Sequence, residues 1–189
     1  MKSFNERCYE VLMKVPKRRL TTYKEIARAI TRIVHEILER NKGTENLCLI
    51  GIQRGGVVLT QRLAKEILKV EGKPIETGIL DITFYRDDLR IKKETPVLKE
   101  TDISFSLIDK KVILVDDVIF TGRTVRAAMD AIMDFGRPAE IHLAILIDRG
   151  HRDFPICADY VGKFVPTSRN ESVKVHIDNE DNKDSVVII

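Results

Sequence analysis

Two adjacent carboxylates stand at the end of an apolar segment, and a short polar loop follows them. The apolar run 112–115 leads into Asp116 and Asp117, and the loop 121–124 supplies two threonines, a glycine and an arginine. A glycine-containing loop that opens a helix offers backbone N–H groups to an anion, and hydroxyl and guanidinium groups add to that cradle. Ionised carboxylates accept hydrogen bonds from vicinal hydroxyls. These residue types in this order predict a site for ribose 5-phosphate.

Buried strands alternate with helical segments along the chain. Continuous apolar runs at 47–52, 111–115 and 141–147 predict strands buried on both faces. Helices are expected at 57–70 and 124–135, after the first two of these strands. Strands that alternate with helices form a parallel sheet with crossover helices, and ligands bind at the carboxyl ends of its strands. The turns after these three strands are therefore the predicted location of the chemistry.

The remaining segments predict the parts that surround this sheet. Thr21 or Thr22 can cap a helix that runs to Gly43, and Glu25 stands three residues after Thr22 as a capping-box partner. The charged stretch 86–105 contains few apolar residues and predicts a mobile loop or hairpin. Further expected elements are a short helix over 4–14, a loop over 15–20, and strands over 75–85, 160–165, 173–177 and 185–189.

Composition restricts the class of protein. A chain of 189 residues with 43% hydrophobic and 32% charged residues can build one ordinary domain with its own core. This excludes a disordered, collagen-like or coiled-coil chain. No apolar run approaches the length of a membrane span. The three cysteines form no Cys-x-x-Cys pair, which makes a zinc ribbon or redox motif unexpected and favours the reducing cytoplasm.

Segment 112–124 resembles the phosphoribosyl pyrophosphate motif of type I phosphoribosyltransferases. The resemblance extends over about residues 26–189 and is most specific to one subfamily, the pyrimidine operon attenuation proteins that are also uracil phosphoribosyltransferases. It implies the α/β fold of type I phosphoribosyltransferases, with a central parallel sheet flanked by helices and a small hood. The segments that carry the subfamily resemblance are 29–37, 80–89, 147–152 and 159–168.

The resemblance also implies a reaction, in which uracil and phosphoribosyl pyrophosphate (PRPP) give UMP and pyrophosphate. Mg²⁺ would be carried mainly by PRPP, so no protein metal ligand is expected. Asp116 and Asp117 would hold the ribose hydroxyls and the loop 121–124 the 5-phosphate. The implied catalytic residues are Arg54, Asp116, Asp117 and Arg149. The implied substrate-binding residues are Arg54, Gly55, Asp116, Asp117, Val118, Ile119, Phe120, Thr121, Gly122, Arg123, Thr124, Asp148, Arg149, Lys163 and Phe164.

Three features of the sequence bear on its place in the family. Two depart from the usual subfamily sequence, and one separates pyrimidine from purine enzymes. The subfamily tends to read Thr-Arg-Gly after the first strand, whereas this chain has Arg54, Gly55 and a second glycine. The shifted arginine leaves open a non-catalytic regulator that senses nucleotides and binds RNA. Phe120 stands where purine phosphoribosyltransferases often carry an aspartate, which argues against a purine enzyme. Phe164 replaces a residue that is commonly polar in the subfamily.

The subfamily resemblance further implies binding of pyrimidine leader mRNA, with UMP or UTP as co-regulator, as a homodimer or homotetramer. Thr31 and His35 lie one helical turn apart and share a face. RNA recognition combines cations for phosphates with hydrogen-bonding side chains for unstacked bases. A solvated helix face and a charged loop are the alternative interpretation. The implied RNA-binding residues are Thr31, Arg32, His35, Arg149, His151 and Arg152.

The N-terminal part is basic and unusual for this subfamily. We expect a basic helical extension over 1–25, followed by the phosphoribosyltransferase domain over 26–189. Residues 4–30 weakly resemble the winged-helix opening of alkylated-DNA alkyltransferases. The Pro-Cys-His-Arg site of those enzymes is absent from the sequence, so Cys8 is not assigned as a nucleophile and DNA is not an expected partner.

Overall fold

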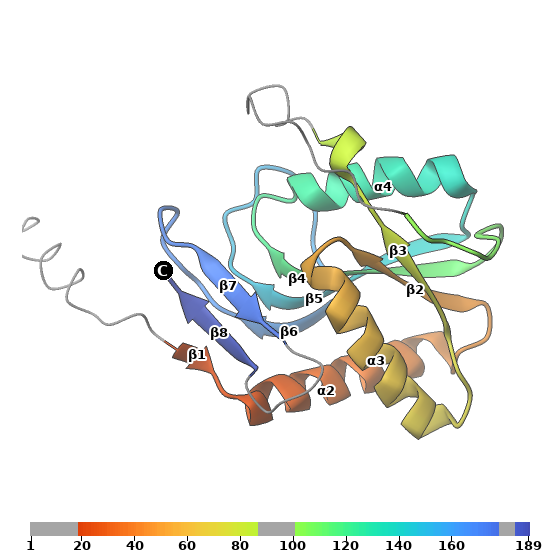
Figure 1. Cartoon of the computed structure of the whole chain (residues 1–189), viewed down its shortest axis with the longest axis horizontal. Coiled ribbons are helices and arrows are strands. Elements are labelled where there is room, and N and C mark those ends of the chain that lie inside the picture. Colours follow the sequence, from red (N-terminus) through yellow and green to blue (C-terminus); the bar gives the residue numbers. More distant parts are fainter. Residues whose placement is uncertain (1–18, 87–100, 178–183) are drawn as a thin grey trace, which may run out of the picture.

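A computed structural model describes residues 19–86, 101–177 and 184–189 (Figure 1). The helix expected over 4–14 and most of the loops expected over 15–20 and 86–105 lie outside these residues. All statements below concern the described part of the chain.

The centre of the molecule is a five-stranded sheet in the order β3-β2-β4-β5-β6, and every neighbouring pair is parallel. The apolar runs that predicted buried strands form β2, β4 and β5. This confirms the expected α/β class with crossover helices. The strands are β2 (Leu47–Ile52), β3 (Glu76–Leu80), β4 (Lys111–Ile119), β5 (Glu140–Asp148) and β6 (Tyr160–Phe164).

Helices cover both faces of this sheet (Figure 1). Helices α2 (Tyr23–Asn41) and α3 (Gly55–Glu71) pack on one face, and α4 (Arg123–Phe135) packs on the other. Successive side chains of a strand point to opposite faces, so Leu49 joins the core under α2 and α3 while Ile50 joins the core under α4. Among the helices described here, none is both long and apolar enough to span a membrane.

The predicted capping box fixes the start of α2. The N–H of Glu25 donates to Thr22 Oγ1 at 3.4 Å, and the N–H of Thr22 donates to Glu25 Oε2 at 2.9 Å. At the other end Lys42 takes the left-handed conformation with φ 56°, one residue before the glycine expected to stop the helix. Ile26 and Ile30 are buried in the core, so residues 23–30, the last part of the segment that resembles a winged helix, form the first turns of a core helix.

A second, smaller sheet joins the two ends of the chain. It contains β1 (Arg19–Thr21), β8 (Ser185–Ile188) and β7 (Val173–His176), paired antiparallel in that order (Figure 1). This is the hood that the family resemblance implied. The expectation of a loop through residue 20 was wrong at its end, because residues 19–21 pair with a strand that lies more than 160 residues later in the chain. The expected boundary between 25 and 26 falls inside α2.

A buried ion pair ties the hood to the main domain. Asp184, which directly precedes β8, is fully buried, and both of its carboxylate oxygens accept from Arg62 Nη2 of α3, at 3.0 and 2.9 Å. Val186 of β8 is also fully buried and packs in the same core as α2 and α3. The hood is therefore anchored through both charge and apolar contact.

The strand expected over 75–85 ends early. It stops at Leu80 because the Asp81 side chain accepts hydrogen bonds from the N–H of Thr83 at 2.8 Å and from its hydroxyl at 2.5 Å. An aspartate that bonds the backbone two residues later makes a turn in place of extended chain. Part of the expected loop 86–105 is attached to this strand, since Asp102 and Ile79 exchange two backbone hydrogen bonds.

Candidate functional site

The predicted site residues lie side by side at the carboxyl ends of three neighbouring strands. Ile119 of β4 pairs with Asp148 of β5, which in turn pairs with Phe164 of β6. Lys163 lies opposite Ile147, one step earlier along the same pair of strands. Residues separated by about 45 positions in the sequence therefore lie side by side at the edge where the chemistry was expected.

Asp116 and Asp117 lie near the end of β4 in a largely buried position. Asp116 is 6% exposed, and its Oδ1 accepts the N–H of Asp117 at 2.9 Å. Burial, and then the neighbouring charge of Asp117, raise the pKa of the Asp116 carboxyl well above its usual range. Burial also raises the pKa of Asp117. Two such carboxyls gain most from ligand groups that donate hydrogen bonds or carry positive charge.

The turn after β2 approaches these carboxyls so closely that a side chain added here would displace its neighbours. A Cβ on Gly55 would lie 2.2 Å from the Asp117 carboxylate, and a Cβ on Gly56 would lie 2.1 Å from the carbonyl oxygen of Val115. Gly55 is the position where the subfamily tends to carry its arginine. The glycine at this position is thus explained by contact with the carboxylate pair.

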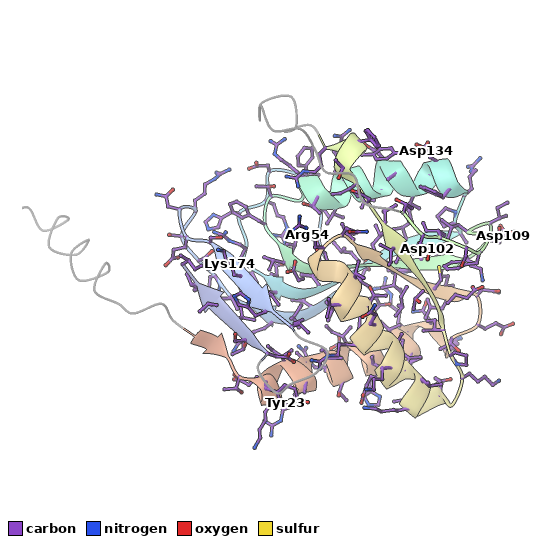
Figure 2. All side chains as sticks on the ribbon, viewed as in Figure 1. Tyr23, Arg54, Asp102, Asp109, Asp134 and Lys174 are labelled. Atoms are coloured by element: carbon purple, nitrogen blue, oxygen red, sulfur yellow. The ribbon has the colours of Figure 1, made fainter. Side chains whose placement is uncertain are left out.

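Arg54 stands immediately before this glycine pair, at the N-cap of α3. Figure 2 shows its side chain at the N-terminal end of that helix. The residue is exposed, and the first turn of α3 contains no acidic residue. A helix N-terminus attracts anions, and a neighbouring guanidinium strengthens that attraction. This turn is a second candidate anion site beside the carboxylates.

The loop after β4 has the form of a phosphate cradle. Gly122 takes the left-handed conformation with φ 91° and forms the N-cap of α4. This cap has no side chain, and the N–H of Arg123 donates to Thr121 Oγ1 over a long 3.5 Å, so an anion can approach the N–H groups at this helix end. Thr121 and Thr124 are half-buried beside it. The Arg123 side chain lies 3.5 Å from the Asp153 carboxylate.

A covering loop, residues 148–156, holds the outer side of this cradle. The carbonyl of Ile119 accepts the N–H of Arg149 at 3.2 Å. The carbonyl of Thr121 accepts the N–H groups of Asp153 and Phe154 at 3.0 and 3.1 Å. Carbonyl oxygens of the phosphate cradle are thereby bonded to the covering loop.

Arg149 is buried and stacked. It is 5% exposed, its guanidinium carbon lies 4.0 Å from the centre of the Phe120 ring, and burial lowers its pKa. Its Nε donates to Thr167 Oγ1 at 3.0 Å and its Nη2 to the carbonyl of Ser168 at 2.8 Å. Sequence reasoning gave Thr167 and Ser168 no role, because no local pattern indicates a partner 18 or 19 residues away.

The end of β6 offers one cation and one exposed aromatic ring. Lys163 Nζ lies 3.8 Å from a Glu25 carboxylate oxygen. Phe164 is 63% exposed, which is high for a phenylalanine at the rim of a site. A planar apolar ring and a mobile ammonium can contact the face and the polar edge of a heterocyclic base.

The residues implied for RNA fall into two groups. On α2, His35 is exposed, Thr31 Oγ1 lies 3.5 Å from the Glu66 carboxylate of α3, and Arg32 Nη2 donates to the Val161 carbonyl of β6 at 3.0 Å. On the covering loop, His151 is exposed, while Arg149 and Arg152 are turned inward. The structure therefore leaves the α2 face and His151 most accessible.

Asp116 and Asp117 could supply some of the ligands of a hard cation, but they do not form a complete metal site by themselves. Within residues 19–86, 101–177 and 184–189, no group of three or more His, Cys, Asp or Glu side chains could hold a metal ion. Mg²⁺ prefers oxygen ligands and keeps several waters. Asp116 and Asp117 offer such oxygens next to both candidate anion sites.

Gly55→Ala should disturb the carboxylates while leaving the fold intact. The added Cβ meets the Asp117 side chain, which can rotate away, rather than backbone. We expect ribose 5-phosphate to bind ~10-fold more weakly or worse in calorimetry, because a displaced group loses its alignment with the ligand. The control is Gly72→Ala, at φ 69° with nothing within 4 Å of the added atom. It should cost about 1 kcal/mol of stability and no affinity; unchanged affinity in Gly55→Ala would contradict the geometry.

Asp116→Asn should stabilise the folded protein at neutral pH. Its raised pKa means that the folded state keeps a proton that the unfolded chain has released, so the free energy of unfolding falls as the pH rises above about 4. Asparagine removes this effect and can still accept the N–H of Asp117. We expect a gain of about 1 kcal/mol at pH 7 in urea denaturation and convergence with wild type near pH 4. A variant less stable than wild type at pH 7 would disprove the assignment.

Comparisons with known proteins match this geometry. The phosphoribosyl transferase domain model matches residues 18–180. The chain is 60% identical over 164 residues to the bifunctional protein PyrR of Caldicellulosiruptor bescii, covering 87% of this chain and 90% of that protein. It is 56% identical over 174 residues to the bifunctional protein PyrR of Deinococcus deserti, covering 92% and 95%.

Solved structures support the same fold. The hypoxanthine phosphoribosyltransferase of Trypanosoma cruzi superposes with a TM-score of 0.67 at 20% identity, over 91% of this chain and 95% of that one. At this identity the likeness concerns the fold alone. Taken with the family model and the curated relatives, it shows that the chain belongs to the type I phosphoribosyltransferases and, among them, to the PyrR proteins.

Proposed function

We propose that this protein transfers the ribose 5-phosphate group of PRPP to uracil, which yields UMP and pyrophosphate, and that it also regulates pyrimidine genes by binding leader mRNA. One observation carries the catalytic part. The Asp116–Asp117 pair, in which Asp116 is buried and Asp117 half-buried, lies between a glycine-capped helix end on one side and the Arg54–Gly55 turn on the other. This arrangement can hold a phosphate, two ribose hydroxyls and a pyrophosphate together.

The reaction needs positioning and charge neutralisation more than a strong base. The ring nitrogen of uracil attacks the anomeric carbon, the bond from that carbon to the pyrophosphate oxygen breaks, and the weakly acidic ring proton passes to the departing pyrophosphate or to water. Asp116 and Asp117 accept the ribose hydroxyls and so orient the anomeric carbon. Arg54 and the N-terminus of α3 stabilise the negative charge that develops on the departing pyrophosphate. Asp116 and Asp117 would offer oxygen ligands to Mg²⁺, which would arrive mainly on PRPP and supply charge neutralisation at its pyrophosphate.

The base pocket is assigned to the rim formed by β6 and Phe120. Purine enzymes of this family often carry an aspartate where Phe120 stands, and a phenyl ring cannot meet a purine ring nitrogen in that way. Lys163 and Phe164 provide an ammonium and an apolar face at the end of β6. These features support a pyrimidine base over a purine.

The shifted arginine does not favour a non-catalytic regulator. Gly55 contacts the Asp117 carboxylate, and the neighbouring Arg54 is exposed at the start of α3. Among the described residues, no ion pair holds the Arg54 guanidinium away from a pyrophosphate. A cation is therefore retained at this turn.

UMP synthesis from uracil and Mg²⁺–PRPP tests the catalytic proposal. The double variant Asp116→Asn, Asp117→Asn should lose at least about 1,000-fold in kcat/KM, because the ribose hydroxyls lose two carboxyl groups that accept their hydrogen bonds. The matched control is Asp130→Asn, which removes a carboxylate that forms an exposed ion pair on α4 and should leave the rate unchanged. A wild-type protein that binds UMP but makes none would favour the non-catalytic regulator.

The RNA surface is proposed on the exposed face of α2, with Thr31, Arg32 and His35, together with His151 of the covering loop. Arg32 is 54% exposed at its side chain and His35 is exposed. Both can reach phosphates or unstacked bases of a partner RNA. Arg32 also donates to the Val161 and Gly162 carbonyls of β6, so it touches the strand assigned to the base pocket. This contact is a direct route from bound uridine nucleotide to the RNA surface.

Binding of the pyrimidine leader transcript in the presence of UMP tests this surface. Arg32→Gln with His35→Gln should weaken RNA binding by about 1–3 kcal/mol and should lower the slope of log affinity against log salt by roughly 1. The control is Arg126→Gln on α4, which covers the opposite face of the sheet. RNA affinity that falls equally in the control would remove the α2 face from the proposal.

Two further assignments follow from the family resemblance. We propose a homodimer or homotetramer that places the RNA surfaces of two protomers together. We also place the protein in the cytoplasm. The two cysteines in the described part of the chain, Cys48 and Cys157, are unpaired, which is ordinary in a reducing compartment.

A further inference from the structure

Arg152 is enclosed by acceptors from its own chain. Its Nη2 donates to Asp148 Oδ2 at 2.6 Å and its Nη1 to the Phe120 carbonyl at 2.8 Å. Its Nε donates to the Ile156 carbonyl at 3.0 Å, and Nη1 also reaches the Gly150 carbonyl at 3.2 Å. The side chain is 20% exposed. A single guanidinium thus joins the end of β5, both arms of the covering loop and the phosphate cradle.

The hydrogen bond from Arg152 to the Phe120 carbonyl is one of several that join the end of β4 to the covering loop. The carbonyls of three successive residues, 119, 120 and 121, all accept hydrogen bonds from the covering loop. The outer two take backbone N–H groups, and the middle one takes the Arg152 side chain. Carbonyl oxygens carry negative partial charge and would repel a phosphate. Holding all three against the covering loop keeps the cradle in the form that presents N–H groups to an anion.

We propose that Arg152 is a positioning residue for the 5-phosphate of PRPP and UMP: it fixes the Phe120 carbonyl and the covering loop so that the 121–124 cradle is preorganised. This replaces the implied contact between Arg152 and RNA. It rests on the proposed function in one respect, namely that the cradle binds a 5-phosphate.

An RNA phosphate would have to share the Arg152 guanidinium with four acceptors of its own chain. A phosphate that took the Arg152 guanidinium would compete with the Asp148 carboxylate, which is 15% exposed and already neutralises it. Charge-assisted hydrogen bonds of this length are the stronger class, and a buried carboxylate left without its partner is costly. The positioning role keeps every one of these contacts.

The shape of the guanidinium distinguishes the two roles. Arginine presents its donors in a rigid planar fork, whereas lysine has one ammonium on a flexible stem. An ammonium at this position cannot serve Ile156, Phe120 and Asp148 together. A contact that only requires positive charge tolerates lysine. The set of Arg152 contacts with Asp148, Phe120 and Ile156, which we call the clamp, does not.

Arg152→Lys and Arg152→Gln are therefore compared in the full-length protein. We expect both to raise the KM for PRPP by about 10- to 100-fold, with the KM for uracil changed less than about 2-fold. UMP should bind more weakly in calorimetry by the same factor as the KM for PRPP rises. The control is Arg169→Lys, which changes an exposed arginine that pairs with Asp153 of the same covering loop, and should have no effect.

Inhibition by two fragments of the substrate locates the defect. Ribose 5-phosphate should inhibit the Arg152 variants 10- to 100-fold more weakly than wild type, since it uses the 5-phosphate cradle. Inorganic pyrophosphate should inhibit them as well as wild type, since it uses the Arg54 turn. A purely structural defect would weaken both inhibitors and lower kcat.

Wild-type behaviour of Arg152→Lys in PRPP KM and UMP affinity would overturn the clamp. The clamp would also be overturned if ribose 5-phosphate and pyrophosphate lost potency equally as inhibitors of the Arg152 variants. Urea denaturation checks that the variants fold; if they do not, Asp148→Asn weakens one clamp contact and should produce a smaller shift in the same direction. If wild type makes no UMP, the proposed catalysis fails, and the clamp is then decided by calorimetric binding of ribose 5-phosphate to wild type and Arg152→Lys.

Discussion

The burial of two adjacent carboxyls at the end of β4 is the constraint on which the rest of the site depends. Asp116 and Asp117 repel each other and are poorly solvated, so the folded protein raises their pKa values. Such a pair lowers stability unless a ligand compensates it. In the function we propose, ribose hydroxyls and Mg²⁺-bound PRPP would supply the missing donors and charge. Affinity for the substrate and strain in its absence thus have the same origin.

The neighbouring turns are shaped around that pair. Gly55 and Gly56 allow the start of α3 to approach the end of β4, and any larger residue would meet a carboxylate or a backbone carbonyl. On the other side Gly122 ends the phosphate loop and opens α4. Both helix ends therefore point positive partial charge at the region between them. The sheet does the positioning, and the glycines make the close approach possible.

The covering loop and the hood connect this centre to the rest of the molecule. Arg149 and Arg152 carry positive charge, yet both are used internally, one stacked on Phe120 and the other among carbonyls and Asp148. The Arg32 contact with β6 extends the same network to α2. Hydrogen bonds thus connect the proposed RNA surface to the strand to which we assign the base pocket.

The sequence by itself determined the α/β fold, the capping box at Thr22 and the edge of the sheet at which the candidate site residues meet, because apolar runs, caps and glycine turns are local signals. Tertiary structure alone decided the pairing of β1 with β8 and the inward turn of Arg152. Their partners lie far along the chain or are backbone carbonyls that no side-chain pattern marks. A charged residue in a sequence can equally face solvent, an RNA or its own fold, and only the position of its acceptors distinguishes these.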